Sequence, residues 1–411
     1  YASIEHLYHP ELAGKPLAVG GDPEARHGIV LAKDQMAKKA GVKTGMALWQ
    51  ARQVCPDIIF IPPHMDRYLR FSRLAHEIYG DYTDFQEPFG IDEVWMDVTA
   101  STSLKGDGRK IAEEISKRIK SELGITVSIG ISWNKIFAKF GSDYKKPDAI
   151  TEITPDNYKQ IVWTKPTGDL LYVGPATRKK LDSHGIHTIG QLAQAGPEYL
   201  HSRLGKMGYI LSAFANGEDR TPVSIENTSA PIKSIGNSTT TLRDLVDDTD
   251  VQIIIFLLAE SVSARLRENH FKGTTVEISV RDNELYHFTR QKKLVMPTDI
   301  TNEIAAAAMQ LFRENYRWNR PIRSVGVRAS GLVFEDCPVQ LNLFISQEQR
   351  EKLHKADVAV DEIRRRFGFY SIQRGIMYTD RKLSALNAKE DNIVHPHGYM
   401  ERGNRTGVCA G

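Results

Sequence analysis

The sequence is poor in cysteine and has no long apolar run. Its 411 residues include only three cysteines, Cys55, Cys337 and Cys409. They are odd in number and lack the paired spacing of a disulfide framework or a zinc site, so we expect a reducing, cytoplasmic location. The apolar run at 253–259 is far shorter than the roughly 18 residues that a membrane-spanning helix needs. The sequence therefore predicts no membrane segment.

The charge balance is also weak. A net charge of +3 at pH 7 does not by itself indicate a nucleic-acid partner. The length allows about two to four domains, because single domains usually span about 100–200 residues. Composition alone leaves the function open, and local motifs have to decide it.

The most informative segment holds two adjacent carboxylates, Asp92 and Glu93. They follow a turn-prone Pro-Phe-Gly sequence at 88–90 and precede the alternating apolar residues of 94–98. Adjacent residues of a strand point to opposite faces, so both carboxylates can serve one site only at a hairpin tip. Such oxygen ligands suit Mg²⁺, which also binds substrate phosphates. A solvated acidic hairpin is the alternative, since acidic turns are common.

The next residues predict one layer of an α+β fold, followed by short helices. Residues 108–124 have the apolar spacing of an amphipathic helix, and 125–131 alternate as in a half-buried strand. Between 154 and 217 the segment 171–177 resembles a helix-hairpin-helix, with Gly174 and Ala176 in its turn. Backbone N–H groups at a helix start can bind a DNA phosphate. An ordinary helical turn explains the same residues.

Residues 232–334 show the order strand, helix, strand, strand, helix, strand, which is the split β-α-β-β-α-β arrangement. Basic residues lie on or beside these strands, and acidic residues gather near the helices. A basic sheet face would lie along a phosphate backbone, whereas a merely solvated face is the alternative. The residues expected to contact DNA are Arg243, Arg281, Arg290, Lys292 and Arg328.

The character of the chain changes after residue 335. A compact apolar peptide, Gln340-Leu341-Asn342-Leu343-Phe344, stands in a polar setting. Exposed adjacent apolar side chains often mark a partner site, and a strand that continues the preceding domain is the alternative. A helix is predicted over about 347–367, and the tail from 387 is polar.

Several of these motifs occur in the order found in one protein family. Over about residues 1–345 the chain resembles a Y-family translesion DNA polymerase of the bacterial polymerase IV kind. The segments that carry the resemblance are 1–5, 14–16, 40–46, 91–93, 130–135, 138–139, 145–147, 173–175 and 340–344. The resemblance implies an α+β multidomain fold shaped like a right hand, with palm, fingers, helical thumb and a β-α-β-β-α-β little finger. The implied domains are fingers at 1–66, palm at 67–152, thumb at 153–216, linker at 217–231, little finger at 232–334, and clamp-binding peptide with tail at 335–411.

The resemblance also implies error-prone, template-directed DNA synthesis by phosphoryl transfer with two Mg²⁺ ions. Asp92 would bridge both ions, and Glu93 would reach the ion that activates the primer 3′-OH. The family's third carboxylate, on the first palm strand, would precede Tyr1. We therefore expect these 411 residues alone to be inactive and a full-length parent to be active.

Nucleotide contacts are implied at positions that match the family's motifs. Tyr1 matches a steric gate against the ribonucleotide 2′-OH, and an aromatic side chain that only packs between palm and fingers is the alternative. Lys146 matches a lysine at the phosphates. Gln35 and Lys38 stand where the family has Tyr and Arg, and Lys38 also fits an ordinary surface lysine. The residues expected over the nascent base pair are Ile29 and Leu31.

The implied partners are primer–template DNA, deoxynucleoside triphosphates and a bacterial sliding clamp, and the expected state is a monomer. The residues expected to bind the clamp are Gln340, Leu341, Leu343 and Phe344. Two other functions fit parts of the sequence. A non-catalytic DNA- and clamp-binding paralogue would keep the fold. A palm-type nucleotidyl cyclase would explain the paired acids but not the other motifs.

Deletion of the two apolar anchors Leu343 and Phe344 should separate clamp binding from synthesis. We expect clamp-dependent processivity to fall while basal nucleotide insertion is kept, because a few apolar anchors supply most of the affinity for a groove. Primer extension with and without the clamp measures both quantities. Equal losses in the two assays would contradict this and indicate a role in folding.

Overall fold

The computed structural model describes residues 1–21, 28–225, 232–338 and 346–388. The chain forms two compact units, which are described separately. Within the described ranges, the first unit contains residues 1–2, 11–21, 28–63 and the described part of 232–388, and the second contains 3–10 and 64–225. Among the described residues, no helix combines the length and hydropathy needed to cross a membrane.

Residues 11–63 of the first unit form a three-stranded sheet with two short helices. The elements are β1 Leu17–Gly20, β2 Val30–Lys33, α2 Gln35–Lys39, α3 Leu48–Val54 and β3 Ile59–Ile61. β1 is the central strand and is buried along its whole length. Helix α2 begins after Asp34, whose carboxylate accepts a hydrogen bond from the N–H of Ala37. Such a cap satisfies one of the N–H groups that a helix start leaves without a partner.

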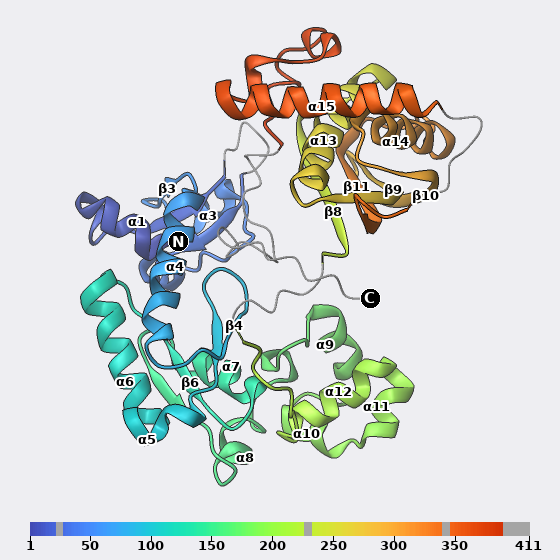
Figure 1. Ribbon diagram of the computed structural model, residues 1–411. Coiled ribbons are helices and arrows are strands. Elements are labelled where there is room, and N and C mark those ends of the chain that lie inside the picture. The colour runs from blue at the N-terminus through green and yellow to red at the C-terminus, as the bar shows by residue number, and fades with distance from the viewer. Residues whose placement is uncertain (22–27, 226–231, 339–345, 389–411) are drawn as a thin grey trace. The chain divides into compact units, whose positions relative to one another are not determined.

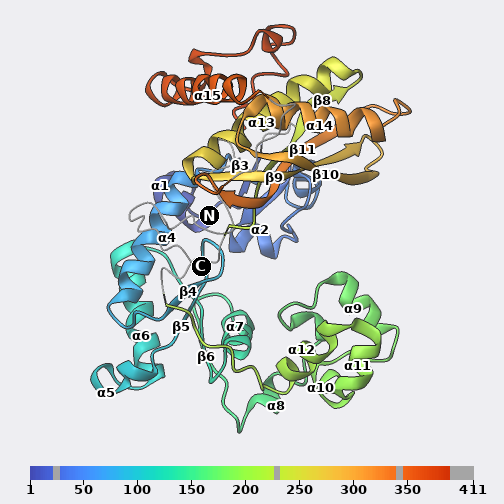
Figure 2. The same ribbon diagram turned by 45° about the vertical axis from the view of Figure 1, so that its right-hand side comes forward.

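Residues 232–334 form a four-stranded antiparallel sheet that two long helices cover on one face (Figures 1 and 2). The elements are β8 Ser234–Leu245, α13 Asp248–Glu268, β9 Phe271–Asp282, β10 His287–Thr298, α14 Thr301–Asn315 and β11 Ile322–Phe334. The strand order is β10–β9–β11–β8. The predicted β-α-β-β-α-β arrangement is confirmed.

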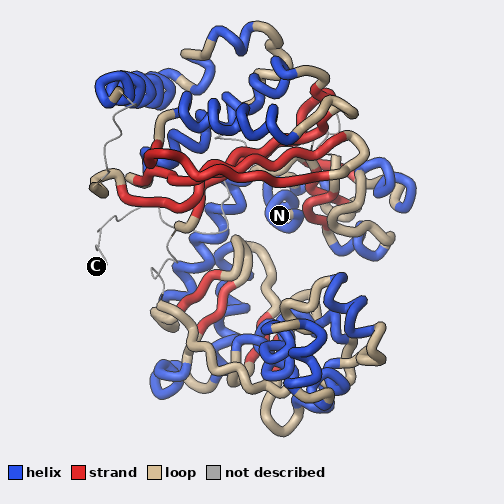
Figure 3. The backbone as a smooth tube through the Cα atoms, turned by 90° about the vertical axis from the view of Figure 1, so that its right-hand side faces the viewer, coloured by secondary structure: helices blue, strands red, loops and turns tan. Residues whose placement is uncertain are grey.

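Alternation along the strands gives this sheet one apolar and one polar face. Val276, Ile278 and Val280 of β9 pack with Val325 and Val327 of β11 in the core under the helices. Figure 3 shows the four strands in one layer with α13 and α14 along the same side. The apolar run 253–259 lies within α13, where all but one of its residues are buried. The fold therefore explains this run as core.

Helix α15, Gln347–Phe367, has the predicted bounds but no buried residue. Ion pairs attach it to α13 and α14. Arg350 lies 2.7 Å from Glu303 of α14, and Arg364 lies 3.0 Å from Glu260 of α13. The chain beyond α15 then supplies apolar side chains to the core. These are Met377, Leu383 and Ala388.

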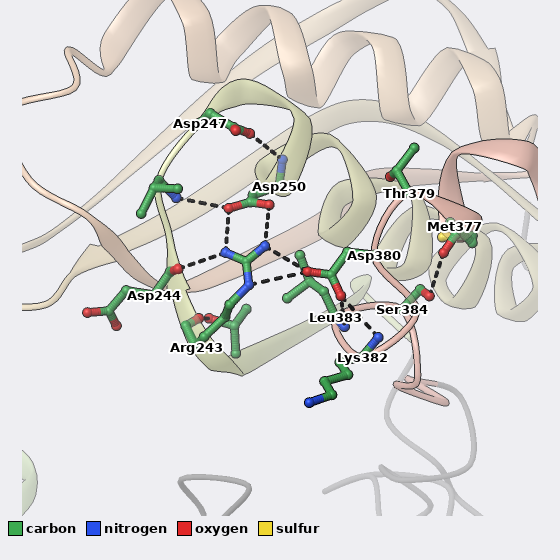
Figure 4. A network of polar contacts seen from close by, with 12 residues as sticks. Arg243, Asp244, Asp247, Asp250, Met377, Thr379, Asp380, Lys382, Leu383 and Ser384 are labelled. Atoms are coloured by element: carbon green, nitrogen blue, oxygen red, sulfur yellow. Dashed lines mark hydrogen bonds and ion pairs between the residues drawn. The ribbon is translucent and has the colours of Figure 1, made fainter.

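Arg243 joins three segments of the first unit through its guanidinium (Figure 4). Its two terminal nitrogens each donate to Asp250 of α13 at 2.6 Å, and Nη2 also donates to Asp380 at 2.8 Å. Burial alone would raise the pKa of the Asp250 carboxyl, but hydrogen bonds from Arg243 and from the Val246 N–H lower it. The Leu383 N–H and Arg243 lower the pKa of Asp380. The Arg243 side chain is still 45% exposed, and the contact with DNA that the sequence suggests for it stays a prediction.

The second unit combines a mixed α/β part with a cluster of short helices (Figure 1). The α/β elements are α1 Ala2–Tyr8, which belongs to this unit from Ser3 on, α4 Met65–Gly80, β4 Gln86–Pro88, β5 Val94–Met96, α5 Thr102–Lys105, α6 Gly108–Arg118, β6 Ile129–Ile131, α7 Lys135–Tyr144 and β7 Ile150–Glu152. The short helices are α8 Tyr158–Ile161, α9 Pro175–Asp182, α10 Ile189–Gln194, α11 Pro197–Leu204 and α12 Lys206–Ala215. The carboxylate hairpin is formed by β4 and β5.

Two details of this unit differ from the sequence-based expectation. The helix predicted over 108–124 finishes in a π turn, Ile119–Leu123, and ends at Gly124, whose φ is 68°. The strand predicted over 125–131 is shorter, because only Ile129–Ile131 pair with a neighbouring strand, β7. Gly130 in this strand lets α7 rest directly on it, since a Cβ there would lie 1.9 Å from the carbonyl oxygen of Ala138.

Substitution Arg243→Met should loosen the start of α13 and the 377–384 segment together. It leaves the carboxylates of Asp250 and Asp380 without their shared cation, and we expect a cost of about 2 kcal/mol, which hydrogen exchange of both segments would measure. Because the folded pKa values of both acids are lowered, this contribution is present above about pH 4 and is lost as the pH falls through the lowered values.

Arg313→Met is the matched control. Arg313 of α14 binds Asp248, which lies in the same turn of α13 as Asp250, but the side chains of Arg313 and Asp248 are both largely exposed. An exposed pair contributes about 0–1 kcal/mol, so exchange should change little. Equal effects of the two substitutions would contradict the assignment of Arg243 as the connecting residue.

Candidate active site

The two adjacent carboxylates lie at the tip of the β4–β5 hairpin, as predicted. β4 and β5 pair from Gln86↔Met96 to Pro88↔Val94, and the N–H of Phe89 donates to the carbonyl of Glu93 at 2.8 Å. Gly90 has a φ of 85°, which a residue with a Cβ adopts at a cost. The turn exposes Asp92 and leaves Glu93 half-buried.

Helix α7 and one aromatic side chain hold the hairpin in place. Lys135 of α7 lies 2.9 Å from the carboxylate of Glu87 on β4, and its carbonyl accepts a hydrogen bond from Trp95 Nε1 at 2.9 Å. The N–H of Ser224 also donates to Glu87 at 2.9 Å. Burial alone would raise the pKa of Glu87, but the bonds from Ser224 and Lys135 lower it. Both strands of the hairpin are therefore fixed to α7.

A chain of alternating charges leads from Glu93 along α7. Lys139 Nζ lies 2.7 Å from Glu93 and 2.9 Å from Asp143, and Asp143 lies 2.6 Å from Lys146. Burial alone would lower the pKa of Lys139, but its hydrogen bonds to Glu93 and Asp143 raise it. Burial would raise the pKa of Asp143, and Lys146 and Lys139 lower it. Lys139 and Asp143 are thus both held in their charged forms.

Lys139 and Asp143 are functional candidates that the residue-by-residue prediction missed. Their signal is nevertheless visible in the sequence. Lys139 and Asp143 stand four residues apart and so share one face of a helix, and Lys146 follows just beyond the end of that helix. The helix itself follows a strand whose glycine permits close approach. The sequence alone does not show that this helix face contacts the carboxylate hairpin.

The hairpin supplies oxygen ligands suited to Mg²⁺. The structure shows no partner for the carboxylate of Asp92 within the described part of the chain, and Glu93 is engaged only by Lys139. Across the described residues, no three His, Cys, Asp or Glu side chains are placed together for a metal. The residues present therefore fit two of the ligands that Mg²⁺ takes, with phosphates and waters as the natural complement.

The predicted nucleotide residues of the first unit lie on exposed surfaces. Gln35 and Lys38 are exposed and share one face of α2, three residues apart. Ile29 and Leu31 are exposed on either side of the buried Val30. Tyr1 is half-buried. Their roles stay predictions, as does the contact of Lys146 with a nucleotide, although the structure does join Lys146 to the network of Glu93.

Register separates the predicted DNA residues of the four-stranded sheet into two groups. Arg281 and Arg328 lie on the face that the helices leave open, and both are exposed. The same face carries Lys293, opposite Thr275 on β9, which the sequence reading missed. The period of two residues along a strand explains why Lys293 points to this face when Lys292 does not.

Arg290 and Lys292 lie on the helix-covered side of the edge strand β10. In register they oppose core residues of β9. Lys292 Nζ donates to Gln310 at 2.8 Å, and Arg290 Nε donates to Asn315 at 3.2 Å, both on α14. The expectation of a single basic face is therefore corrected for these two residues, and their contact with DNA stays a prediction.

The glycine turn before α9 has the expected form. Gly174 is the N-cap residue of α9, and both Gly174 and Ala176 are exposed. Contact of this turn with DNA stays a prediction. The clamp-binding residues Gln340, Leu341, Leu343 and Phe344 lie outside the described residues.

The fold and the carboxylate hairpin define a Y-family polymerase architecture. A solved Y-family DNA polymerase chimera matches with a TM-score of 0.69 and 22% sequence identity, over 80% of this chain and 96% of that chain. The chain belongs to the impB/mucB/samB family, whose main model matches residues 1–143 and whose C-terminal domain model matches residues 232–343.

Curated relatives support the same assignment. DNA polymerase IV of Acetivibrio thermocellus is 50% identical over 94% of this chain and 97% of that protein. DNA polymerase IV of Pelotomaculum thermopropionicum is 37% identical over 92% of this chain and 93% of that protein, and DNA polymerase IV 1 of Bacillus subtilis is 38% identical over 91% and 90%. The predicted family and the predicted enzyme class, a DNA-directed DNA polymerase, are confirmed.

Substitution Lys139→Met in the full-length protein should lower the maximal rate of primer extension by about 10-fold, because Glu93 and Asp143 lose the cation that orients them. The Mg²⁺ concentration for half-maximal rate should also fall, by about 2–5-fold, since a competing positive charge is removed. Single-turnover extension across a Mg²⁺ titration measures both quantities.

Lys139→Arg is the control that keeps the charge, and it should retain the Mg²⁺ dependence of the unchanged protein. A Lys139→Met variant with the same rate and the same Mg²⁺ requirement would contradict the role given to this lysine.

Proposed function

We propose that this protein extends a primer strand opposite damaged templates by phosphoryl transfer assisted by two Mg²⁺ ions. The observation that supports this most directly is the carboxylate pair at the hairpin tip, of which Asp92 is exposed and Glu93 is linked through Lys139 and Asp143 to Lys146. A metal-binding end and a cationic end suited to phosphates thus occur in one network. This pairing is what transfer of a nucleotide onto a primer 3′-OH requires.

Asp92 and Glu93 would hold the metal, which when bound supplies Lewis-acid stabilisation of the reacting oxygens. The lysines of the network would bind the triphosphate and adjust the contact to Glu93. Lys146 would leave Asp143 for a triphosphate oxygen, because a phosphate carries more negative charge than a carboxylate. Asp143 would then have Lys139 as its remaining partner. Lys139 would in turn loosen its contact with Glu93, so that the Glu93 carboxylate becomes available to the metal.

The first unit would supply the remaining nucleotide contacts. Gln35 would donate to a phosphate oxygen, and Lys38 would add a point charge without the fork of an arginine. Ile29 and Leu31 would cover the nascent base pair with apolar surface. The Tyr1 ring would exclude a ribose 2′-OH, since an unpaired hydroxyl against an aromatic edge costs about 1–3 kcal/mol.

The proposal includes the expected partners. Primer–template DNA would lie against the turn at Gly174 and Ala176 and against the open sheet face with Arg281 and Arg328. Residues 340–344 would bind a bacterial sliding clamp, and the protein would act as a monomer in the cytoplasm. Phosphate contacts of this kind are independent of sequence and weaken with salt, which suits an enzyme that copies any template.

Substitutions Asp92→Asn and Glu93→Gln in the full-length protein test the proposal. Each keeps the shape of its side chain but removes the charge that a divalent cation needs, so we expect nucleotide incorporation to fall by at least about 100-fold. Affinity for primer–template DNA should change little. Incorporation of one nucleotide under Mg²⁺ and DNA-binding anisotropy measure the two quantities.

Asp97→Asn is the matched control, because Asp97 is an exposed acid just beyond β5 that accepts a hydrogen bond from the Thr99 N–H. It should keep nearly full activity. An Asp92→Asn variant within about threefold of the unchanged protein would exclude the metal role of the hairpin, since loss of one metal-binding charge costs far more than that.

A further inference from the structure

A pocket of about 390 Å³ lies beside the charge network, on the side of α7 that faces the short helices of the second unit. One wall is formed by Lys139, Phe140 and Asp143 of α7, and the other by residues 168–174, which lead into α9. Lys139 therefore has two neighbours. Its amine contacts Glu93 of the hairpin, and its side chain lines the pocket. Lys139 thus connects the carboxylate hairpin with the pocket.

Tyr172 lines the opposite wall in an unusual backbone conformation. The N–H of Val173 donates to the carbonyl of Leu170 at 3.1 Å, which closes a tight turn. Tyr172 is the third residue of this turn and has a φ of 68°. Turns with positive φ at this position favour glycine or asparagine, because a Cβ crowds the backbone. A tyrosine is retained here against its local preference.

The ring of Tyr172 contributes little to the folded interior. Tyr172 is 56% exposed. Within the described part of the chain its one aromatic neighbour is Phe214, with ring centroids 6.1 Å apart and planes tilted by 32°. Packing in the protein therefore does not account for an aromatic residue at a strained position. A ring that lines a pocket and is open to solvent is instead available to a ligand.

The charges of the pocket indicate which part of a ligand this ring can contact. Lys139 and Lys146 neutralise Asp143. Asp169 also lines the pocket, and within the described residues its carboxylate has no hydrogen-bond or ion-pair partner. A phosphate is therefore disfavoured on the pocket floor. The neutral ring of Tyr172 suits a deoxyribose, with the flanking phosphates turned toward the rim.

We propose that the Tyr172 ring packs against a deoxyribose of the primer strand close to its 3′ end. The inference rests on the proposed function, because it takes the primer terminus to react at Glu93. From there the strand passes Lys139, which joins the hairpin to the pocket, and reaches the turn that carries Tyr172. The strained tyrosine is then a positioning residue for the primer rather than part of the core.

The substitution Tyr172→Gly separates this role from a structural one. Glycine adopts the positive φ without strain, so the unfolding temperature should be unchanged or higher, by up to about 4 °C. Affinity for a primer–template duplex should nevertheless fall by about 5–30-fold, which is the lower part of the range for loss of an aromatic stacking contact to a base. Thermal unfolding and fluorescence anisotropy of labelled DNA measure the two effects.

Tyr172→Phe is the matched control, since it keeps the ring and removes only the hydroxyl. It should bind DNA within about twofold of the unchanged protein, a difference too small for the loss of a stacking contact. A scan of the primer strand then locates the contact. In this scan a flexible propanediol spacer replaces one nucleotide of the primer at a time. At one position the spacer should weaken binding to the unchanged protein more than it weakens binding to Tyr172→Gly.

Each outcome has a distinct meaning. An unfolding temperature of Tyr172→Gly lower by more than about 4 °C would make the ring a packing residue and overturn the inference. The inference would also fail if Tyr172→Phe lost as much affinity as Tyr172→Gly, or if the spacer scan gave the same profile for both proteins. If the unchanged protein bound no primer–template DNA, the proposed function itself would fail instead.

Discussion

The attachment of the carboxylate hairpin to helix α7 is the constraint on which the site depends. Lys135 and Lys139 stand one turn apart on α7. They bind Glu87 in the middle of β4 and Glu93 in the hairpin turn. Both lysine side chains are mostly buried, so these pairs are less screened by water than surface pairs are. The position of the acids is therefore set by one helix face.

The helix can serve as this support because it lies unusually close to the sheet beneath it. Only a glycine at 130 permits that approach, since any Cβ would overlap the carbonyl of Ala138. The same helix carries Asp143 and ends just before Lys146, and its other side lines the pocket that Tyr172 closes. The carboxylate hairpin and the wall of the pocket beside Tyr172 are thus both built against one rigid helix. Sites built on such elements hold their geometry better than sites on loops.

The first unit shows two different ways of attaching a helix. α13 and α14 bury apolar side chains against the sheet, and this packing is largely insensitive to salt. α15 buries none of its residues and is held by pairs such as Arg350–Glu303. The attachment of α15 therefore depends on the charges of these residues, whereas that of α13 and α14 depends on apolar burial.

Residue spacing was enough to predict the large elements and much of the site. The β-α-β-β-α-β order, the helix at 347–367 and the hairpin with Asp92 and Glu93 at its tip all follow from periodicity and turn residues. The strand at 125–131 was predicted too long because alternation shows which residues are half-buried but not which have a partner strand. The periodicity of apolar residues is a local property of the sequence, whereas strand pairing depends on residues that are far apart in it.

The sequence by itself determined the kinds of chemistry available: adjacent acids for a metal, lysines for phosphates and a basic β domain. Only the tertiary structure decided which of these groups act together. In the folded protein Glu93 is linked to Lys139, Asp143 and Lys146, and Arg243 forms an ion pair with Asp250. Arg290 and Lys292 lie on the helix-covered side of the sheet. The physical reason is that charges interact over a few ångströms of space, and residues far apart in the sequence reach that distance only when strands pair and helices pack.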